Sequence, residues 1–341
     1  MTVHRIGPNL RDDLFKYRIT TTEMAESSFH MNIHDSLTRR NILTALATAP
    51  LALAQDPVIR VDVQLVNITF TVRNKQGGLV GNLTKEDFTV FEDGKPQEIN
   101  RFQRDTDLPL TIGLLIDISG SMYNVIDTGK RAAAEFFRKV LRPKDLAFLI
   151  TFGSELELMQ DLTSSVSLLE RNLNKVEGQR PTRVMTQGPV PTTPRGTRMY
   201  DAIYLAAEEK LKDEAGRKVI VLLTDGADQG SFYKPAETLK QTHLSDAVIY
   251  SFFYYEPMYG SDEGSLKRLS GETGGRVFDV TKRGSLDRSF EQLQEEMRSQ
   301  YALSYSPSND KRDGAFRRVE IKTKDSSLKV QARRGYYATP A

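Results

Sequence analysis

The sequence predicts an α/β protein: a doubly wound, mostly parallel six-stranded sheet, inserted in a β-sandwich that the two ends of the chain form together. Continuous apolar runs, typical of strands buried on both faces, alternate with helical patterns, and this alternation predicts the sheet. Both flanks of this region instead alternate apolar and polar residues with a period of two, which predicts antiparallel strands.

The composition excludes several classes of function. The chain has 341 residues, enough for two domains, and a net charge of +2, which gives no indication of nucleic-acid binding. It has no cysteine, so disulfides, thiolate zinc sites and cysteine nucleophiles are excluded. Of its 4 histidines, only His243 follows the leader described next, and we expect it to be an exposed structural residue.

The first 54 residues carry an export signal. Residues 1–30 are polar and without pattern, which predicts a disordered extension, and Met31 is a candidate true start. Residues 31–54 contain the pair Arg39-Arg40, the apolar stretch Ile42 to Leu53 and small residues at the end, the pattern of a twin-arginine signal peptide. Its apolar core is too short to span a bilayer. We expect an exported protein that is periplasmic, cell-surface or extracellular; an amphipathic N-terminal helix is the alternative.

The flanks are predicted to form one β-sandwich, with an N-terminal part over residues 58–107 and a C-terminal part over residues 301–338. Neither part has enough strands to be stable alone, so we expect them to join; two separate small sheets are the alternative. A short helical turn is expected at Leu83–Phe88 and a hairpin turn at Glu92–Lys95. The expected strands are Ile59 to Leu65, Ile68–Val72, Phe88–Phe91, Gln97–Ile99, Tyr301–Tyr305, Phe316–Thr323 and Ser327–Arg333.

Residues 108–300 are predicted to form the inserted α/β domain. The expected strands are Leu108–Ile116, Leu146–Phe152, Glu157–Gln160, Lys218–Thr224, Ala247–Phe253 and the edge strand Arg276–Asp279. The expected helices are Val125–Val140, Val166–Val176, Met199–Lys212, Pro235–His243, Leu266–Ser270 and Leu286–Met297.

A polar cluster, Asp117-Ile118-Ser119-Gly120-Ser121, follows the first apolar strand. Ligands of open α/β sheets bind outside the carboxyl ends of the strands, and carboxylate and hydroxyl oxygens are the donors that magnesium prefers. Alone, the cluster is explained equally by a helix N-cap made by Asp117 or Ser119.

Two further segments make the cluster part of a larger pattern. Asp117-x-Ser119-x-Ser121 resembles the first loop of the metal-ion-dependent adhesion site of von Willebrand factor type A domains. Gly196-Thr197-Arg198-Met199-Tyr200-Asp201-Ala202 resembles the second loop, and Val219-Ile220-Val221-Leu222-Leu223-Thr224-Asp225-Gly226 resembles the strand and third loop. The resemblance implies a von Willebrand factor type A domain over residues 108–300, with five metal-binding residues: Asp117, Ser119, Ser121, Thr197 and Asp225.

The resemblance implies a protein-binding function. Two aspartates balance one divalent cation, Mg²⁺ or else Mn²⁺ or Ca²⁺, and leave room for an acidic side chain of a protein ligand to complete its coordination. No catalytic residue is predicted. The alternatives are a structural or scaffold envelope protein with a non-functional metal site, and a magnesium-dependent phosphoryl-transfer enzyme. The enzyme is disfavoured because Ser119 stands where a second carboxylate would be expected.

Three neighbouring segments have open roles. Gly178 to Gly196 is a long loop whose arginines pair with an acidic ligand or are merely solvated. Tyr254 to Tyr259 follows a strand and forms a binding surface or packs on the strand ends. Asp228 is expected to cap the next turn rather than bind metal. Taken whole, the chain also resembles exported bacterial proteins described as von Willebrand factor A-related, of the acidobacterial type, on Leu83 to Lys95 and Arg333 to Ala338.

Overall fold

The computed structural model describes residues 65–341 except 105–107, 180–195, 258–259, 283 and 340–341. The predictions for residues 1–30 and 31–54, for the strand pattern from Ile59 and for most of the loop before Gly196 lie outside the described residues. In the described part, no helix combines the length and apolar character needed to cross a membrane.

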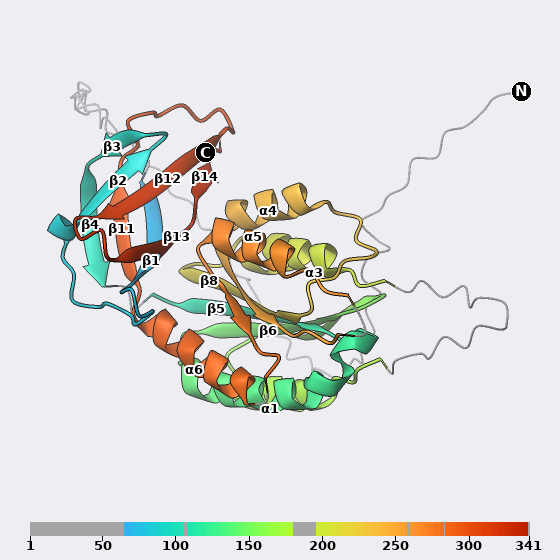
Figure 1. Cartoon of the computed structure of the whole chain (residues 1–341). Coiled ribbons are helices and arrows are strands. Elements are labelled where there is room, and N and C mark those ends of the chain that lie inside the picture. The colour runs from blue at the N-terminus through green and yellow to red at the C-terminus, as the bar shows by residue number, and fades with distance from the viewer. Residues whose placement is uncertain (1–64, 105–107, 180–195, 258–259, 283, 340–341) are drawn as a thin grey trace, which may run out of the picture. The chain divides into compact units, whose positions relative to one another are not determined.

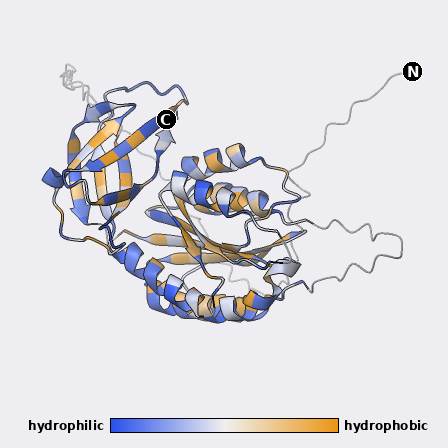
Figure 2. Cartoon of the chain, in the orientation of Figure 1, coloured by the Kyte–Doolittle hydropathy of each residue, from blue (hydrophilic) through white to orange (hydrophobic). Residues whose placement is uncertain are grey.

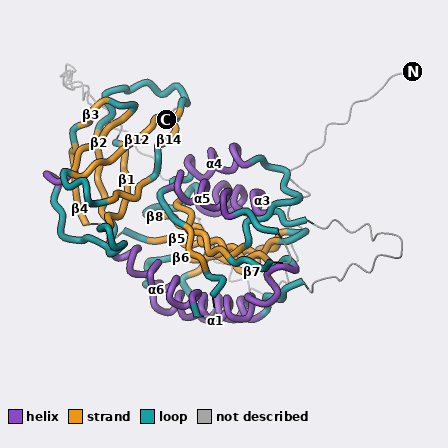
Figure 3. Tube along the Cα trace, in the orientation of Figure 1, coloured by secondary structure: helices purple, strands orange, loops and turns teal. Residues whose placement is uncertain are grey.

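The centre of the fold is a six-stranded sheet with strand order β10-β9-β8-β5-β6-β7 (Figures 1 and 3). Neighbouring strands are parallel, except that edge strand β7 runs antiparallel to β6. All eight residues of β5 are buried, which is why its sequence is apolar without alternation. The predicted doubly wound sheet is confirmed. Its strands are β5 (Leu110–Asp117), β6 (Leu146–Phe152), β7 (Leu156–Thr163), β8 (Arg217–Thr224), β9 (Ala247–Phe253) and β10 (Val277–Asp279).

Helices cover both faces of this sheet (Figure 1). Leu114 and Ile116 of β5 pack in one apolar cluster with residues of α1, α2 and α6, whereas Leu115 packs in a second cluster with residues of α3 and α5. Consecutive strand residues thus face opposite helical layers, and the hydrophobic strands lie between the more polar helices (Figure 2). The helices are α1 (Tyr123–Val140), α2 (Val166–Asn174), α3 (Met199–Leu205), α4 (Pro235–Leu244), α5 (Glu263–Thr273) and α6 (Ser285–Arg298).

Two helices differ from the predicted spans. The helix expected over Met199–Lys212 changes after Leu205 into a π-helical segment, η3 (Ala206–Leu211). Helix α5 is longer than the expected Leu266–Ser270 because the Asp262 side chain accepts a hydrogen bond from the Ser265 backbone and caps its start, while Gly274 ends it at a φ of 91°.

The flanks form two four-stranded sheets with the orders β13-β1-β11-β4 and β14-β12-β2-β3. Each sheet contains strands from both ends of the chain, so the predicted joint sandwich is confirmed against the alternative of two separate small sheets. Asp93 and Gly94 have positive φ in the predicted hairpin turn between β2 and β3. The elements are β1 (Val66–Arg73), η1 (Lys85–Asp87), β2 (Phe88–Glu92), β3 (Lys95–Gln97), β4 (Ile99–Arg104), β11 (Tyr301–Tyr305), β12 (Phe316–Thr323), β13 (Lys329–Ala332) and β14 (Gly335–Tyr337).

One core serves both sheets of the sandwich. Phe70 of β1 contacts Phe88 of β2 edge-to-face at 5.1 Å and stacks on Tyr301 of β11 at 5.5 Å. The same core holds a buried carboxylate, Glu92, which accepts hydrogen bonds from the Tyr305 hydroxyl at 2.8 Å and the Tyr336 hydroxyl at 2.9 Å. Both hydrogen bonds end on the Oε2 atom, so this side chain links strands of both sheets and one of its oxygens is satisfied twice where an unpaired polar group would be costly.

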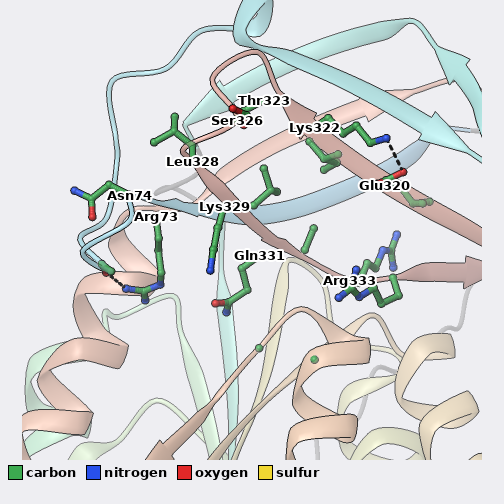
Figure 4. Close-up of a pocket in the computed structure, with 18 of the residues that line it drawn as sticks. Arg73, Asn74, Glu320, Lys322, Thr323, Ser326, Leu328, Lys329, Gln331 and Arg333 are labelled. Atoms are coloured by element: carbon green, nitrogen blue, oxygen red, sulfur yellow. Dashed lines mark hydrogen bonds and ion pairs between the residues drawn. The ribbon is translucent and has the colours of Figure 1, made fainter.

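A second buried carboxylate connects the central domain with the sandwich. Glu296 of α6 is fully buried and accepts hydrogen bonds from Arg73 of β1 at 2.5 Å, Arg276 at 2.9 Å and Gln331 of β13 at 2.7 Å. Its partners therefore come from the N-terminal flank, the central domain and the C-terminal flank. Figure 4 shows the positions of Arg73 and Gln331.

The expectation that His243 is exposed is wrong. His243 is buried, with a relative solvent exposure of 5%. Its ring lies edge-on to the ring of Phe316 at 5.3 Å and to that of Tyr337 at 6.3 Å. These two aromatic residues belong to the sandwich, so the polar pattern of helix α4 alone gave no sign of them. Burial, and then the positive charge of Arg333, lower the pKa of His243 to about 4.

This burial predicts an acid sensitivity located at His243. Because its pKa is lowered from 6.5, the neutral ring stabilises the fold above pH 6.5, and this stability is lost as the pH falls toward 4. Between pH 7 and pH 5 the wild-type protein should lose about 2 kcal/mol more unfolding free energy than His243→Leu. Urea denaturation of both proteins at several pH values measures the difference, and parallel pH profiles would contradict it.

Candidate metal centre

Asp117 lies at the point where the strand order of the sheet reverses. It is the last residue of β5, between β8 and β6, and is fully buried. Its Oδ1 atom accepts a hydrogen bond from the Ser119 backbone at 2.9 Å, and its Oδ2 atom accepts one from the Thr224 hydroxyl at 2.7 Å. The carboxylate is therefore fixed by its own loop and by the neighbouring strand.

The two serines of the first loop lie together. The Ser119 and Ser121 hydroxyl oxygens are 3.1 Å apart, where the chain makes the short 3₁₀ helix η2 (Gly120–Met122) before α1. The alternative helix-cap role is not found: neither Ser119, which precedes η2, nor Met122, which precedes α1, makes a side-chain capping hydrogen bond. Asp117 binds the Ser119 backbone and Thr224 instead.

Asp225 follows β8 directly and so lies beside the end of β5. Its Oδ1 atom accepts a hydrogen bond from the Ala227 backbone at 2.9 Å, and its own backbone carbonyl accepts one from Asp262 at 3.0 Å. The nearby Ser121 hydroxyl of the first loop partly offsets the effect of burial on the pKa of Asp225, so the first and third loops lie close together. Thr224, whose role the sequence analysis missed, adds the contact to Asp117; the signal for it was a polar residue at the end of an apolar strand.

The second loop is attached to both of its neighbours through its backbone. The Thr197 carbonyl accepts a hydrogen bond from Gln229 of the third loop at 3.0 Å, and Arg198 donates from its backbone to the Gly153 carbonyl, just after β6, at 3.0 Å. Thr197 itself is buried. The structure thus brings all three predicted loops to the same edge of the sheet, with Thr197 held to the third loop through its backbone.

Two carboxylates that sequence reasoning did not assign to the site fasten the second loop to the third. Asp201 binds the Arg198 guanidinium at 2.7 Å and accepts a hydrogen bond from the Tyr233 backbone at 2.9 Å. Asp228 accepts from the Ser231 hydroxyl at 2.5 Å, as expected for a residue that caps the next turn, and also from the Tyr200 backbone at 3.3 Å. These contacts fix the turn that carries Thr197.

The electrostatics of the site favour a cation. Burial raises the pKa of Asp117 to about 7, and the nearby charge of Asp225 adds to this effect. Burial also raises the pKa of Asp225. Two desolvated carboxylates that repel each other are costly when both are ionised, and a divalent cation between them would remove that cost.

The donor set fits a hard divalent cation. Two carboxylates and the hydroxyls of Ser119, Ser121 and Thr197 offer only oxygen, which suits Mg²⁺, Mn²⁺ or Ca²⁺ better than a soft metal. Among the described residues, no group of three or more His, Asp or Glu side chains could hold a metal ion. A cation here would therefore depend on hydroxyls and water for the rest of its coordination.

Gly226 predicts a sensitive position next to the site. Its φ is +81°, and a Cβ atom would lie 2.4 Å from the Asp262 carbonyl oxygen. Gly226→Ala should therefore push Asp225 away from Asp262, lower the unfolding free energy by about 1–3 kcal/mol and weaken cation binding. Gly230→Ala, in the same loop but with its nearest neighbour at 3.5 Å, is the control. Denaturation and magnesium titration measure both effects; equal behaviour of the two variants would contradict the prediction.

A cavity of about 680 Å³ lies at other residues, and none of the five predicted site residues lines it (Figure 4). Three of its basic side chains have acidic partners: Arg73 binds Glu296, Lys322 lies 3.3 Å from Glu320, and Arg333 binds Asp246. The cavity therefore does not compete with the sheet edge as the candidate site.

Comparisons with known proteins found several solved structures that resemble parts of this chain. Among solved structures, similar chains include the conserved hypothetical protein BatB from Bacteroides thetaiotaomicron, with a TM-score of 0.43, 16% identity, and coverage of 55% of this chain and 98% of that one. They include a von Willebrand factor type A protein from Catenulispora acidiphila, with a TM-score of 0.46, 12% identity, and coverage of 82% and 75%. They also include proximal thread matrix protein 1 of the mussel byssus with a zinc-occupied MIDAS motif, with a TM-score of 0.48, 17% identity, and coverage of 61% and 50%.

The assignment to a family rests on the sequence. No curated protein matches the chain. The family model of the von Willebrand factor type A domain matches residues 112–227, the segment that runs from β5 through the third loop and contains all five predicted site residues. This protein therefore contains a von Willebrand factor type A domain.

Proposed function

We propose that the protein is an exported, divalent-cation-dependent protein-binding module and not an enzyme. The cation would be held by Asp117, Ser119, Ser121, Thr197 and Asp225, and an acidic side chain of a protein ligand would complete its coordination. The observation that carries the proposal is the joining of the three loops at the switch point of the sheet: the Thr224 hydroxyl donates to Asp117 at 2.7 Å, and the Gln229 backbone donates to the Thr197 carbonyl at 3.0 Å.

The charge balance supports an adhesive rather than a hydrolytic site. Asp117 and Asp225 match a divalent charge without excess, so an incoming carboxylate is not repelled. Two further carboxylates at this edge, Asp201 and Asp228, are engaged by Arg198 and by Ser231. Because both carboxylates are engaged in this way, neither is free to act as a general acid or base on a phosphoryl or glycosyl substrate.

The test combines metal titration with partner capture. Calorimetric titration of the purified chain with MgCl₂, MnCl₂ and CaCl₂ should give one saturable site, and Asp225→Ala should lose it. Pull-down from the native envelope should recover a partner with magnesium but not with chelator. Metal binding without any chelator-sensitive partner would favour a scaffold role, and absence of metal binding would refute the proposal.

A further inference from the structure

Exposed aromatic residues lie at the edge of the sheet that carries the proposed metal site. In the described part of the central domain, the exposed large hydrophobic residues are Leu108, Tyr123, Phe232, Leu244 and Tyr255. The three aromatic ones, with exposures of 43%, 57% and 41%, all lie on segments that follow the carboxyl ends of β5, β8 and β9. Leu108 and Leu244 precede β5 and β9 and so belong to the opposite edge.

Backbone hydrogen bonds hold two of these aromatic residues, Tyr123 and Tyr255. Tyr123 begins α1, two residues after Ser121, and its backbone donates to the Gly120 carbonyl. Tyr255 follows Tyr254, whose backbone donates to the Thr224 carbonyl at 3.1 Å, and Tyr255 itself donates from its backbone to the Thr281 hydroxyl at 3.1 Å. Both rings therefore sit on backbone that is held in place, Tyr123 directly after the first site loop and Tyr255 on the neighbouring segment after β9.

Phe232 is held in the same way through its neighbour. The Tyr233 backbone donates to Asp201, the Tyr233 ring stacks on Tyr204 at 3.6 Å, and the Phe232 ring meets Tyr233 edge-to-face at 5.3 Å. A rigidly mounted aromatic ring that remains 57% exposed loses little conformational entropy when a partner covers it.

The charges on the same segments argue against an acidic run in the partner. Asp228, Glu256 and Asp262 all lie on the loops that follow β8 and β9, and in the described part of these two loops they outnumber the single basic residue, Lys234. The Arg198 cation is already paired with Asp201 at 2.7 Å. A second or third carboxylate beside the one that reaches the metal would meet these acidic residues and be repelled.

From these observations we infer that the site recognises a protein segment with a single carboxylate flanked by aromatic or aliphatic side chains, which pack on Tyr123, Phe232 and Tyr255. The inference rests on the proposed function, because the carboxylate is directed to the cation. It adds the chemistry of the partner: one acidic residue for the metal and apolar neighbours for the aromatic surface. Aromatic anchors of this kind carry most of the energy in many interfaces.

Fluorescence anisotropy of labelled peptides bound to the full chain tests the inference. Peptides with a central Glu flanked by Leu and Phe, by Ser, or by Asp are compared in magnesium and in chelator, with a central Gln peptide as reference. The apolar-flanked Glu peptide should bind about tenfold more tightly than the Ser-flanked one, and only with magnesium. The triple variant Tyr123→Ser, Phe232→Ser, Tyr255→Ser should lose this preference and keep its magnesium affinity; Leu244→Ser is the control.

The outcomes separate the two proposals. Absence of magnesium binding refutes the proposed function and this inference together. Magnesium binding with no peptide binding, with equal binding of apolar-flanked and Ser-flanked peptides, or with preference for the Asp-flanked peptide overturns this inference alone. Retention of the apolar preference in the triple variant overturns it as well, because another surface would then supply the contacts.

Discussion

Replacing Asp117 with asparagine should abolish divalent-cation binding and at the same time make the metal-free protein more stable at alkaline pH. Cation affinity should fall at least about 100-fold, since mutation of a residue that only hydrogen-bonds to a metal ligand typically lowers metal affinity 10–100-fold. In the wild type, a cation must also displace the proton of Asp117, so its apparent affinity should fall about tenfold per pH unit below pH 7.

The gain in stability follows from the direction of the pKa shift. Because the folded-state pKa of Asp117 is raised from 3.8 to about 7, the neutral carboxyl stabilises the fold below pH 3.8, and this contribution is lost as the pH rises through 7. Asparagine does not ionise, so the metal-free variant should exceed the wild type by up to about 4 kcal/mol at pH values well above 7.

Calorimetric titration and urea denaturation, with and without chelator, measure the two effects. Asp127→Asn is the matched control, because the Asp127 side chain is 90% exposed on helix α1 and pairs only with Lys130 at 3.1 Å. Unchanged cation affinity in Asp117→Asn would remove Asp117 from the site. A variant that binds no metal and is also less stable than the wild type at alkaline pH would contradict the pKa argument.

Replacing Glu296 with alanine should strongly destabilise the fold. The substitution leaves Arg73, Arg276 and Gln331 without their common acceptor. Loss of one member of a buried ionic network costs about 3–5 kcal/mol, and the lower end applies here because both arginine side chains retain some exposure.

Glu295→Ala is the control for this prediction, since Glu295 is the exposed neighbour on the same helix. Glu296→Gln should fall between the two, because an amide oxygen still accepts a hydrogen bond but carries no charge. Urea denaturation of the three variants gives the order, and Arg73→Ala in the Glu296→Ala background should add little. Equal stability of Glu295→Ala and Glu296→Ala would show that the network contributes nothing.

The sequence predicted what depends on local pattern. The apolar run of β5 identified a strand buried on both faces, and Asp93-Gly94 identified the hairpin turn, because each feature needs only residues close in the chain. The three site loops could be found because each follows a recognisable element, although their meeting at one edge required the strand order. The cation and the partner remain predictions that titration must test.

What the sequence could not give depends on contacts between distant residues. His243 is covered by Phe316 and Tyr337, more than seventy positions later, so the polar pattern of its own helix was misleading. The hydrogen bond from Thr224 to Asp117 spans two adjacent strands whose pairing is invisible in a single apolar run. The helices and strands can thus be predicted from the sequence alone, whereas side-chain contacts across the fold become known only from the structure.

The mixed origin of the two outer sheets has a consequence for biosynthesis. Among the described strands, β1 pairs only with β11 and β13, and β4 pairs only with β11, so neither finds these neighbours until the last part of the chain leaves the ribosome. At ordinary elongation rates this delay is on the order of ten seconds or more. The nascent α/β domain can complete its own parallel sheet in that interval. Early folding of the α/β domain would bring its two ends close together. The unpaired strands β1 and β4 would then lie near the position at which β11 and β13 are added.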